Sequence, residues 1–294
     1  MENVKPYLQL LRPANILTAI SDVLAGLALS STLNEVDVHY ETNLLLLCMA
    51  TIGLYGGGIV FNDVFDAMID REERPERPIP SGKVSVRQAT LFGSFFFTLG
   101  LLAAFMVNVS AGSIALFIVI AALFYNKWAK HQLLIGPLIM GLCRGANLLL
   151  GIAIIPPNLL AIGYIAVVPT LYIASITVIS RGEVHGGKKS MAIIAAGIYA
   201  FVLAAIALFA YHHHFLVYTL FCLILLMALI YPPLLQVVRN SNAKNSGKAV
   251  KAGIIGLILL NAAWAMASGS FMLTGIIFLL LPLSFCTARF FAVT

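Results

Sequence analysis

Ten long apolar runs, separated by short polar connections, make up most of the chain. A helix of about 20 apolar residues spans the roughly 30 Å hydrocarbon core of a bilayer. The predicted helices cover about residues 13–33, 42–61, 87–108, 111–126, 133–155, 159–180, 190–211, 215–235, 249–267 and 270–290. The pattern therefore predicts an all-α fold, a multi-span transmembrane helical bundle of nine to ten helices.

The composition excludes a soluble globular protein. Of the 294 residues, 61% are hydrophobic and 10% are charged, with a mean hydropathy of +0.97, whereas soluble domains contain about 25% charged residues. Because little of the chain remains outside the apolar runs, residues 1–294 are predicted to form a single transmembrane domain. The four cysteines lie in apolar runs without a C-x-x-C pair, so neither a disulfide framework nor a thiolate metal site is indicated.

Lysine and arginine residues occur on alternate connections between the predicted helices. They precede the first run and follow the second, fourth, sixth, eighth and tenth, whereas the five intervening connections contain none. Since positive residues accumulate in cytoplasmic loops, both termini and the connections at about 62–87 and 181–190 are predicted to be cytoplasmic. The basic residues are interleaved with the runs and form no stripe, so the net charge of +6 does not indicate a nucleic-acid partner.

Three aspartates follow the second predicted helix on this basic side. Asp63, Asp66 and Asp70 are three and then four residues apart, so a continuous helix places them on one face, with Asn62 four residues before Asp66. Three such carboxylates repel one another unless a cation lies among them, and Mg²⁺ prefers one or two carboxylates together with water and substrate phosphates. The alternative is a solvated helix end whose aspartates pair with the arginines that follow.

The rest of this connection is predicted to be non-helical. Three prolines at 75, 78 and 80 and a glycine at 82 end any helix there. Ser85, with Gln88 three residues later, predicts a capping box at the start of the third helix.

These residues form a recognisable signature. Asn62-Asp63-x-x-Asp66-x-x-x-Asp70, followed by Arg77-Pro78-Ile79-Pro80-Ser81-Gly82, resembles the first aspartate-rich motif of the UbiA superfamily of intramembrane prenyltransferases. Leu11-Arg12-Pro13-Ala14-Asn15 is similar to the start of that family's first span, and Tyr125 with Lys130 resembles the tyrosine and basic residue that end its fourth. The resemblance covers essentially the whole chain.

The resemblance implies an all-helical bundle around a large central cavity that opens laterally to membrane lipid. It implies Mg²⁺ as the cofactor, which bridges aspartates to an isoprenyl diphosphate under the polar cap formed by the loops at about 62–87 and 181–190. The residues expected to bind metal in the first motif are Asp63, Asp66 and Asp70, with Asp63 and Asp66 as catalytic residues. The residues expected to bind substrate are Asn62, Asn15, Arg77, Tyr125 and Lys130.

The second motif departs from the family pattern. The loop at 181–190 contains one carboxylate, Glu183, where family members have several, and this variant looks most like the UbiA-like EboC-type proteins. Glu183 is expected to bind metal and take part in catalysis, His185 to contact substrate, and Lys188 and Lys189 to supply positive charge to phosphate. The alternative is that the lysines only anchor the loop at the membrane surface.

Two charges lie within predicted helices. Asp22 and Arg144 are at similar depths, so one interpretation is a structural ion pair. In the other interpretation Arg144 lines the cavity as a catalytic residue that binds the anionic group of the acceptor or the diphosphate, supported by Asn147 one turn along.

The predicted function is Mg²⁺-dependent alkyl transfer: a prenyl group passes from an isoprenyl diphosphate to a lipophilic or aromatic acceptor within the membrane. No residue pattern selects the acceptor. The departure in the second motif favours an alternative, a UbiA-like protein that binds or moves an isoprenoid or lipid without turnover. An ion-coupled transporter that uses Asp22 and Arg144 ranks last, because paired broken helices are not evident.

Overall fold

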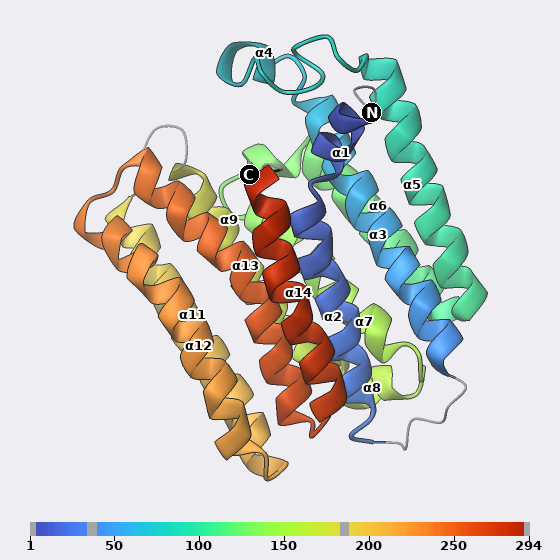
Figure 1. The fold of residues 1–294 in the computed structure, drawn as a ribbon, viewed down its shortest axis with the longest axis vertical. Helices are drawn as coiled ribbons and strands as arrows, with labels where there is room; N and C mark the ends of the chain where they lie inside the picture. The colour runs from blue at the N-terminus through green and yellow to red at the C-terminus, as the bar shows by residue number, and fades with distance from the viewer. Residues whose placement is uncertain (1–3, 34–39, 183–187, 291–294) are drawn as a thin grey trace.

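The computed structural model describes residues 4–33, 40–182 and 188–290, and within these ranges the chain is helical, with no strand (Figure 1). The long helices are α2 (Pro13–Ser30), α3 (Tyr40–Phe65), α5 (Val86–Val107), α6 (Val109–Lys127), α7 (Ile135–Ile152), α9 (Val167–Ser180), α11 (Lys189–His212), α12 (Leu216–Arg239), α13 (Ala243–Ala267) and α14 (Phe271–Phe290). The short elements are α1 (Lys5–Leu11), α4 (Asp70–Glu73), α8 (Asn158–Ile162) and the 3₁₀ turns η1 (Ala129–His131) and η2 (Gly163–Ala166).

The predicted transmembrane bundle is confirmed. Nine helical segments among the described residues are long and apolar enough to cross a membrane, and Phe271–Thr287 forms a shorter apolar helix. The sixth predicted helix is interrupted, because α8, η2 and α9 follow one another and Gly163, a poor helix former, begins the 3₁₀ turn. The predicted capping box is present: the Gln88 amide donates to Ser85 Oγ (3.2 Å) and the Ser85 amide to Gln88 Oε1 (2.9 Å).

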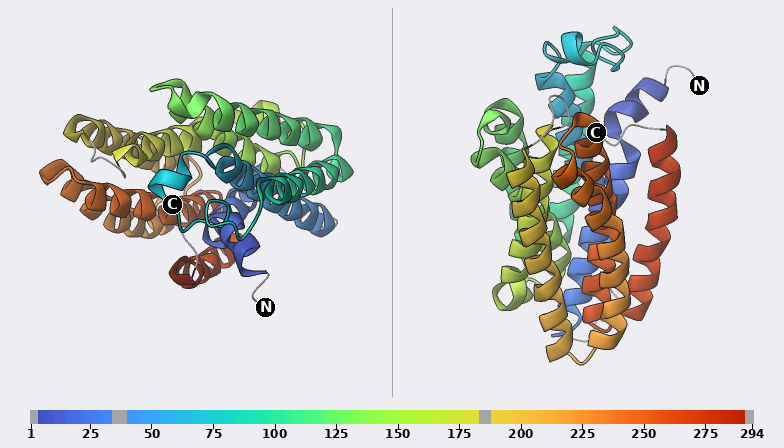
Figure 2. Two further views of the ribbon diagram at one scale, coloured as in Figure 1. Left: turned by 90° about the horizontal axis from the view of Figure 1, so that it is seen from above. Right: turned by 90° about the vertical axis from the view of Figure 1, so that its left-hand side faces the viewer.

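Two helices occupy the centre of the bundle. In the apolar stretches of α2 and α13, 83% of the residues are buried, compared with 28% in those of α5 and α11. Helices α2 and α13 are therefore enclosed by protein, whereas α5 and α11 lie at the periphery. Seen from above, the helices surround this centre, and α4 with the connection around it covers one end (Figures 1 and 2). The described end of α14 and the short helix α1 lie toward that same end.

Glycine lets α2 and α7 approach closely. A Cβ on Gly151 would overlap the carbonyl oxygen of Val23, and one on Gly26 would overlap the carbonyl oxygen of Leu148. Small residues at such crossings allow backbones to touch in lipid, where packing is the main attraction between helices. This contact fixes α7, and therefore Arg144, against α2.

Replacing Gly151 with alanine is expected to lower the free energy of unfolding by about 1–3 kcal/mol, because the added methyl group forces the two helices apart. Thermal unfolding in detergent measures the effect. Gly197→Ala in α11 is the matched control, since no atom lies within 4 Å of its added Cβ and alanine favours helix. Equal stability of the two variants would contradict the proposed packing role of Gly151.

Candidate active site

A cavity of about 500 Å³ lies among α2, α3, α6, α7, α9 and α13 and reaches the connection that contains α4. Its capped end is polar and includes Asn62, Asp66, Asp70 and Lys130. Its interior is mainly apolar, lined by residues that include Leu54, Ile118, Met140, Ile173, Ile176 and Ile254. The cavity thus combines a charged end with a hydrophobic interior inside the membrane-spanning helices.

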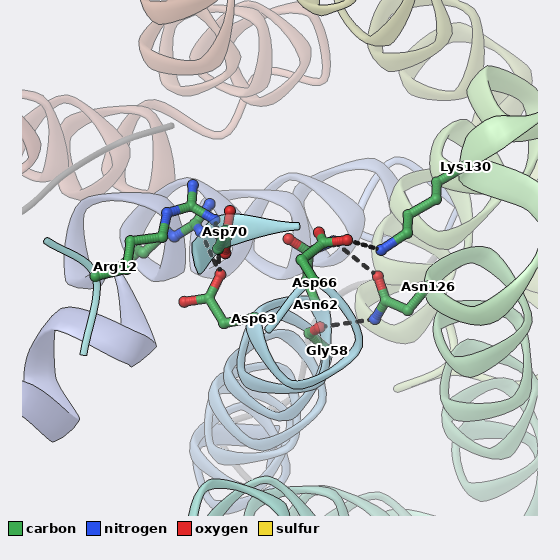
Figure 3. Close-up of polar contacts among 9 residues, drawn as sticks. Arg12, Gly58, Asn62, Asp63, Asp66, Asp70, Asn126 and Lys130 are labelled. Carbon is green, nitrogen blue, oxygen red and sulfur yellow. Dashed lines mark hydrogen bonds and ion pairs between the residues drawn. The ribbon is translucent and has the colours of Figure 1, made fainter. Parts of the chain in front are cut away.

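The aspartates do not share one helical face as predicted. Helix α3 ends at Phe65, and a turn separates it from α4. Backbone hydrogen bonds still join Asp66 N–H to Asn62 O (3.0 Å) and Asp70 N–H to Asp66 O (2.8 Å). The side chains nevertheless diverge, with Asp66 on one side of the chain and Asp63 and Asp70 on the other (Figure 3). The expected single acidic face of a continuous helix is therefore wrong, because α3 ends at Phe65, and the carboxylates contact cations from different segments.

Asp66 faces the side formed by α6 and η1. It forms an ion pair with Lys130 of η1, which lies beyond the end of α6. Next to it, Asn62 Nδ2 donates to Asn126 Oδ1 (3.1 Å), and Asn126 Nδ2 donates to Gly58 O (3.0 Å) (Figure 3). These bonds join α3 to α6 and fix the orientation of the Asn62 amide beside Asp66.

Asp63 and Asp70 face two arginines. Arg77 Nη1 donates to Asp70 Oδ2 (2.8 Å) and lies 3.4 Å from Asp63 Oδ1. Arg12, at the junction of α1 and α2, donates from Nη2 to the same Asp63 oxygen (2.7 Å). Arg12, Arg77 and Asp70 line the cavity, whereas Asp63 is buried and does not. Of the alternative, a solvated helix end whose aspartates pair with the arginines that follow, only the pairing with Arg77 is present, and Asp63 and Asp70 are buried.

The segment that contains Lys130 is tied to α9. Arg181, immediately after α9, donates from Nη2 to the carbonyl oxygens of Gln132 and of Lys130, the latter at 3.4 Å. Gly136 permits this approach, since a Cβ there would meet Ala129 O at 2.7 Å and the Arg181 side chain at 3.3 Å. The backbone at Lys130 is therefore held by Arg181, which follows α9, and packs against Gly136 of α7.

The deep charges form a buried pair, and Arg144 also lines the cavity. Arg144 Nη1 donates to Asp22 Oδ2 (2.8 Å), Asn147 Nδ2 donates to the same oxygen (2.9 Å), and Asn261 Nδ2 donates to Asp22 Oδ1 (2.7 Å). The guanidinium lies 4.8 Å from the ring centre of Tyr55. Arg144, Asn147 and Tyr55 all line the cavity. Arg144 thus forms the structural ion pair and also lines the cavity, whereas its binding of an anionic group of the acceptor or of the diphosphate stays a prediction.

Other predicted residues divide between the cavity and its surroundings. Asn15 and Tyr125 line the cavity. Lys188 and Lys189 are exposed and lie outside its lining, and their phosphate contacts stay predictions. Glu183 and His185 lie outside the described residues, so their roles in metal and substrate binding stay predictions as well.

Arg12, Asn126 and Tyr55 line the cavity but were not selected as site residues from the sequence. Arg12 stands next to Pro13, the first residue of α2, and Asn126 is a polar residue near the end of an apolar run. Tyr55 lies seven residues before Asn62, two turns along the same face of α3. Each position shows a signal, a helix start, an isolated polar residue or a shared register, but none of these specifies contact with a cavity.

The polar end of the cavity offers some of the oxygen ligands that a magnesium ion needs, and phosphate oxygens of a bound substrate would supply others. Within the described ranges, no group of three or more His, Cys, Asp or Glu side chains is placed to hold a metal by itself. Asn62, Asp66 and Asp70 nevertheless present amide and carboxylate oxygens to the same cavity. Because Mg²⁺ commonly takes one or two carboxylates and completes its shell with water and phosphate oxygens, this donor set is compatible with a diphosphate-bound ion.

The comparison with known families decides the assignment. The sequence pattern of the UbiA prenyltransferase family matches residues 20–252, from α2 into α13. The chain belongs to the UbiA prenyltransferase family. This confirms the family predicted from the aspartate motif.

Relatives within the family agree in sequence and fold. A digeranylgeranylglyceryl phosphate synthase from Methanosarcina mazei is 37% identical over 159 residues, which cover 51% of this chain and 55% of that protein, so the chain spans about half the length of this curated relative. A solved structure described as concerning digeranylgeranylglyceryl phosphate synthase in membranes has a TM-score of 0.65 at 24% identity and covers 91% of this chain and 99% of its own. A UbiA homologue from Archaeoglobus fulgidus, bound to DMAPP and Mg²⁺, has a TM-score of 0.61 at 16% identity and covers 94% and 99%.

Proposed function

We propose that this UbiA-family protein transfers a prenyl group from an isoprenyl diphosphate to a lipophilic acceptor inside the membrane, in a Mg²⁺-dependent reaction. The observation that supports this most directly is the cavity, whose charged end contains carboxylates and cations and whose interior is apolar. A diphosphate and its prenyl chain have the same two-part chemistry. The A. fulgidus homologue, which binds DMAPP and Mg²⁺, has the same fold.

The charged end is assigned to the diphosphate. Asn62, Asp66 and Asp70 would hold Mg²⁺, which when bound neutralises phosphate charge. Lys130 and Arg77 are paired with Asp66 and Asp70, and their side chains would be available to contact phosphate oxygens if these carboxylates held the metal. The basic residues thus keep their charge compensated both with and without substrate.

The reaction breaks one bond and forms another. The bond between the allylic carbon and the diphosphate oxygen breaks with its electron pair remaining on the oxygen, and a nucleophilic atom of the acceptor bonds to that carbon. The proton displaced from the acceptor leaves with the diphosphate, so charge and atoms balance. Lys130, Arg77 and Arg12 stabilise the departing negative charge, and the apolar wall excludes water from the allylic cation.

The acceptor is assigned to the region of Arg144. Arg144, Asn147 and Tyr55 form the polar part of the deeper wall, and Tyr55 lies two turns of α3, about 10 Å, from Asn62. The M. mazei relative is named as a digeranylgeranylglyceryl phosphate synthase, which supports a phosphoglycerol lipid as the acceptor. Such a lipid is proposed to place its head near Arg144 and its chain along the apolar wall.

Prenyl transfer by the purified protein is the test. Labelled isoprenyl diphosphates of increasing chain length are supplied with phosphoglycerol lipid or aromatic acceptors, with Mg²⁺ or with EDTA. We expect Mg²⁺-dependent formation of labelled lipid from the phosphoglycerol acceptor. Neither product nor released diphosphate, from protein whose unfolding transition shows that it is folded, would contradict the proposal and favour a lipid-binding protein without turnover.

A further inference from the structure

Asp63 belongs to the aspartate motif but lies behind the cavity wall. Its side chain is 5% exposed and it is not among the residues that line the cavity. Asn62, Asp66 and Asp70, on either side of it in the motif, do line the cavity. A ligand in the cavity therefore meets the motif through these three residues and not through Asp63.

Two arginines separate Asp63 from the cavity. Asp63 Oδ1 accepts from Arg12 Nη2 at 2.7 Å and lies 3.4 Å from Arg77 Nη1. Both arginine side chains are 13% exposed and line the cavity. One carboxylate oxygen thus joins two cations that come from segments 51 and 14 residues away.

The backbone at Arg12 has an uncommon conformation. Arg12 adopts φ 46° and ψ 70°, a left-handed conformation uncommon for a residue other than glycine, at the junction of α1 and α2. A residue in this conformation persists when surrounding contacts determine it. The ion pair with Asp63 is one such contact of Arg12, whose side chain also lines the cavity.

Asp63 also differs from Asp70 in what it can contribute once substrate binds. Asp70 forms the shorter contact with Arg77, at 2.8 Å, but it faces the cavity and is one of the proposed metal ligands. If Asp70 bound a metal ion, Asp63 would be the carboxylate that stays beside both arginines. Asp63 can then keep Arg12 and Arg77 in place without contacting metal or substrate.

We propose that Asp63 is a positioning residue that holds Arg12 and Arg77 toward the diphosphate, and that it is not a metal ligand. The inference rests on the proposed function for its substrate, an isoprenyl diphosphate. The motif alone predicts that Asp63 binds metal and takes part in catalysis. In this proposal Asp63 instead acts through Arg12 and Arg77.

Asp63→Asn tests the role by separating diphosphate affinity from metal dependence. We expect KM for the isoprenyl diphosphate to rise roughly 10- to 100-fold, the size expected when charge-assisted hydrogen bonds are lost, while the Mg²⁺ concentration for half-maximal rate changes less than twofold. Asp70→Asn, which removes a cavity-facing carboxylate, is expected to raise that Mg²⁺ concentration. An equal rise in Asp63→Asn would overturn the proposal.

Binding of inorganic diphosphate in EDTA, measured by calorimetry, provides a readout that needs neither metal nor turnover. Asp63→Asn and Arg12→Gln are each expected to weaken this binding. In the double variant the two losses are expected to be less than additive, because part of the effect of Asp63 passes through Arg12 and the rest through Arg77. Glu72→Gln, an exposed carboxylate of the same connection, is the matched control and is expected to bind as the unchanged protein does. Unchanged binding in Asp63→Asn would overturn the proposal.

The outcomes also separate this inference from the proposed function. If the unchanged protein binds diphosphate in EDTA and Asp63→Asn weakens it, the positioning role holds even when no prenyl transfer is found. If transfer occurs and Asp63→Asn alters neither KM nor binding, the inference fails while the proposed function stands. Should Asp63→Asn unfold, Asp63→Glu keeps the charge and is expected to retain most of the binding, and Arg12→Gln still reports the pair from the other side.

Discussion

Asp66→Asn is expected to reduce the rate of prenyl transfer by roughly 100- to 1,000-fold, the usual cost of removing one preorganised charge-stabilising group from an active site. Asp66 lines the cavity, and its ion pair with Lys130 is the contact between the end of α3 and η1. The amide keeps the shape of the side chain but lacks the charge that a metal ion and Lys130 require. Transfer of a labelled prenyl group at saturating Mg²⁺ measures the effect.

Glu72→Gln is the control for Asp66→Asn, because it makes the same chemical change at an exposed position of the same connection, outside the cavity lining. It is expected to transfer at the unchanged rate. A wild-type rate of transfer by Asp66→Asn would contradict the proposed role of Asp66 in binding the metal ion. Retained lipid binding, with no turnover by either protein, would instead favour the interpretation as a lipid-binding protein.

Arg144→Gln is expected to lower the free energy of unfolding by about 3–5 kcal/mol, because it leaves Asp22 charged, buried and without its cation. Asp22 is fully buried within α2 and receives fixed hydrogen bonds from Asn147 and Asn261. Chemical unfolding in detergent or lipid nanodiscs measures the change. The variant is also expected to lose affinity for the acceptor, since the guanidinium lines the cavity.

The double variant Asp22→Asn, Arg144→Gln distinguishes the ion pair from simple loss of packing. Removing both charges leaves two amides of similar shape, so we expect it to recover most of the stability lost in Arg144→Gln. It is not expected to recover acceptor affinity, because the positive charge on the cavity wall stays absent. Additive losses of stability from the two changes would contradict the interpretation as a coupled buried pair.

The sequence alone determined the local architecture. Apolar runs of membrane-spanning length predicted the helical bundle, and the spacing of Ser85 and Gln88 predicted a capping box. The central cavity was implied by the resemblance of the aspartate motif to the UbiA signature, and Asn62, Asp66 and Asp70 of that motif line it. These features are encoded by residues within a few turns of one another, where spacing and side-chain type are sufficient. Sidedness rests on the distribution of Lys and Arg and stays a prediction.

The tertiary structure decided which charges meet. Asp63 pairs with Arg12, 51 positions away, and Asp66 pairs with Lys130, 64 positions away. Two carboxylates that are three residues apart in the sequence thus contact different cations. Asp22 accepts a hydrogen bond from Asn261, which is 239 positions away in the sequence. Such partners depend on how helices pack, because a side chain's neighbours across a bundle are set by close approaches like that of Gly26 and Gly151, and no local spacing specifies them.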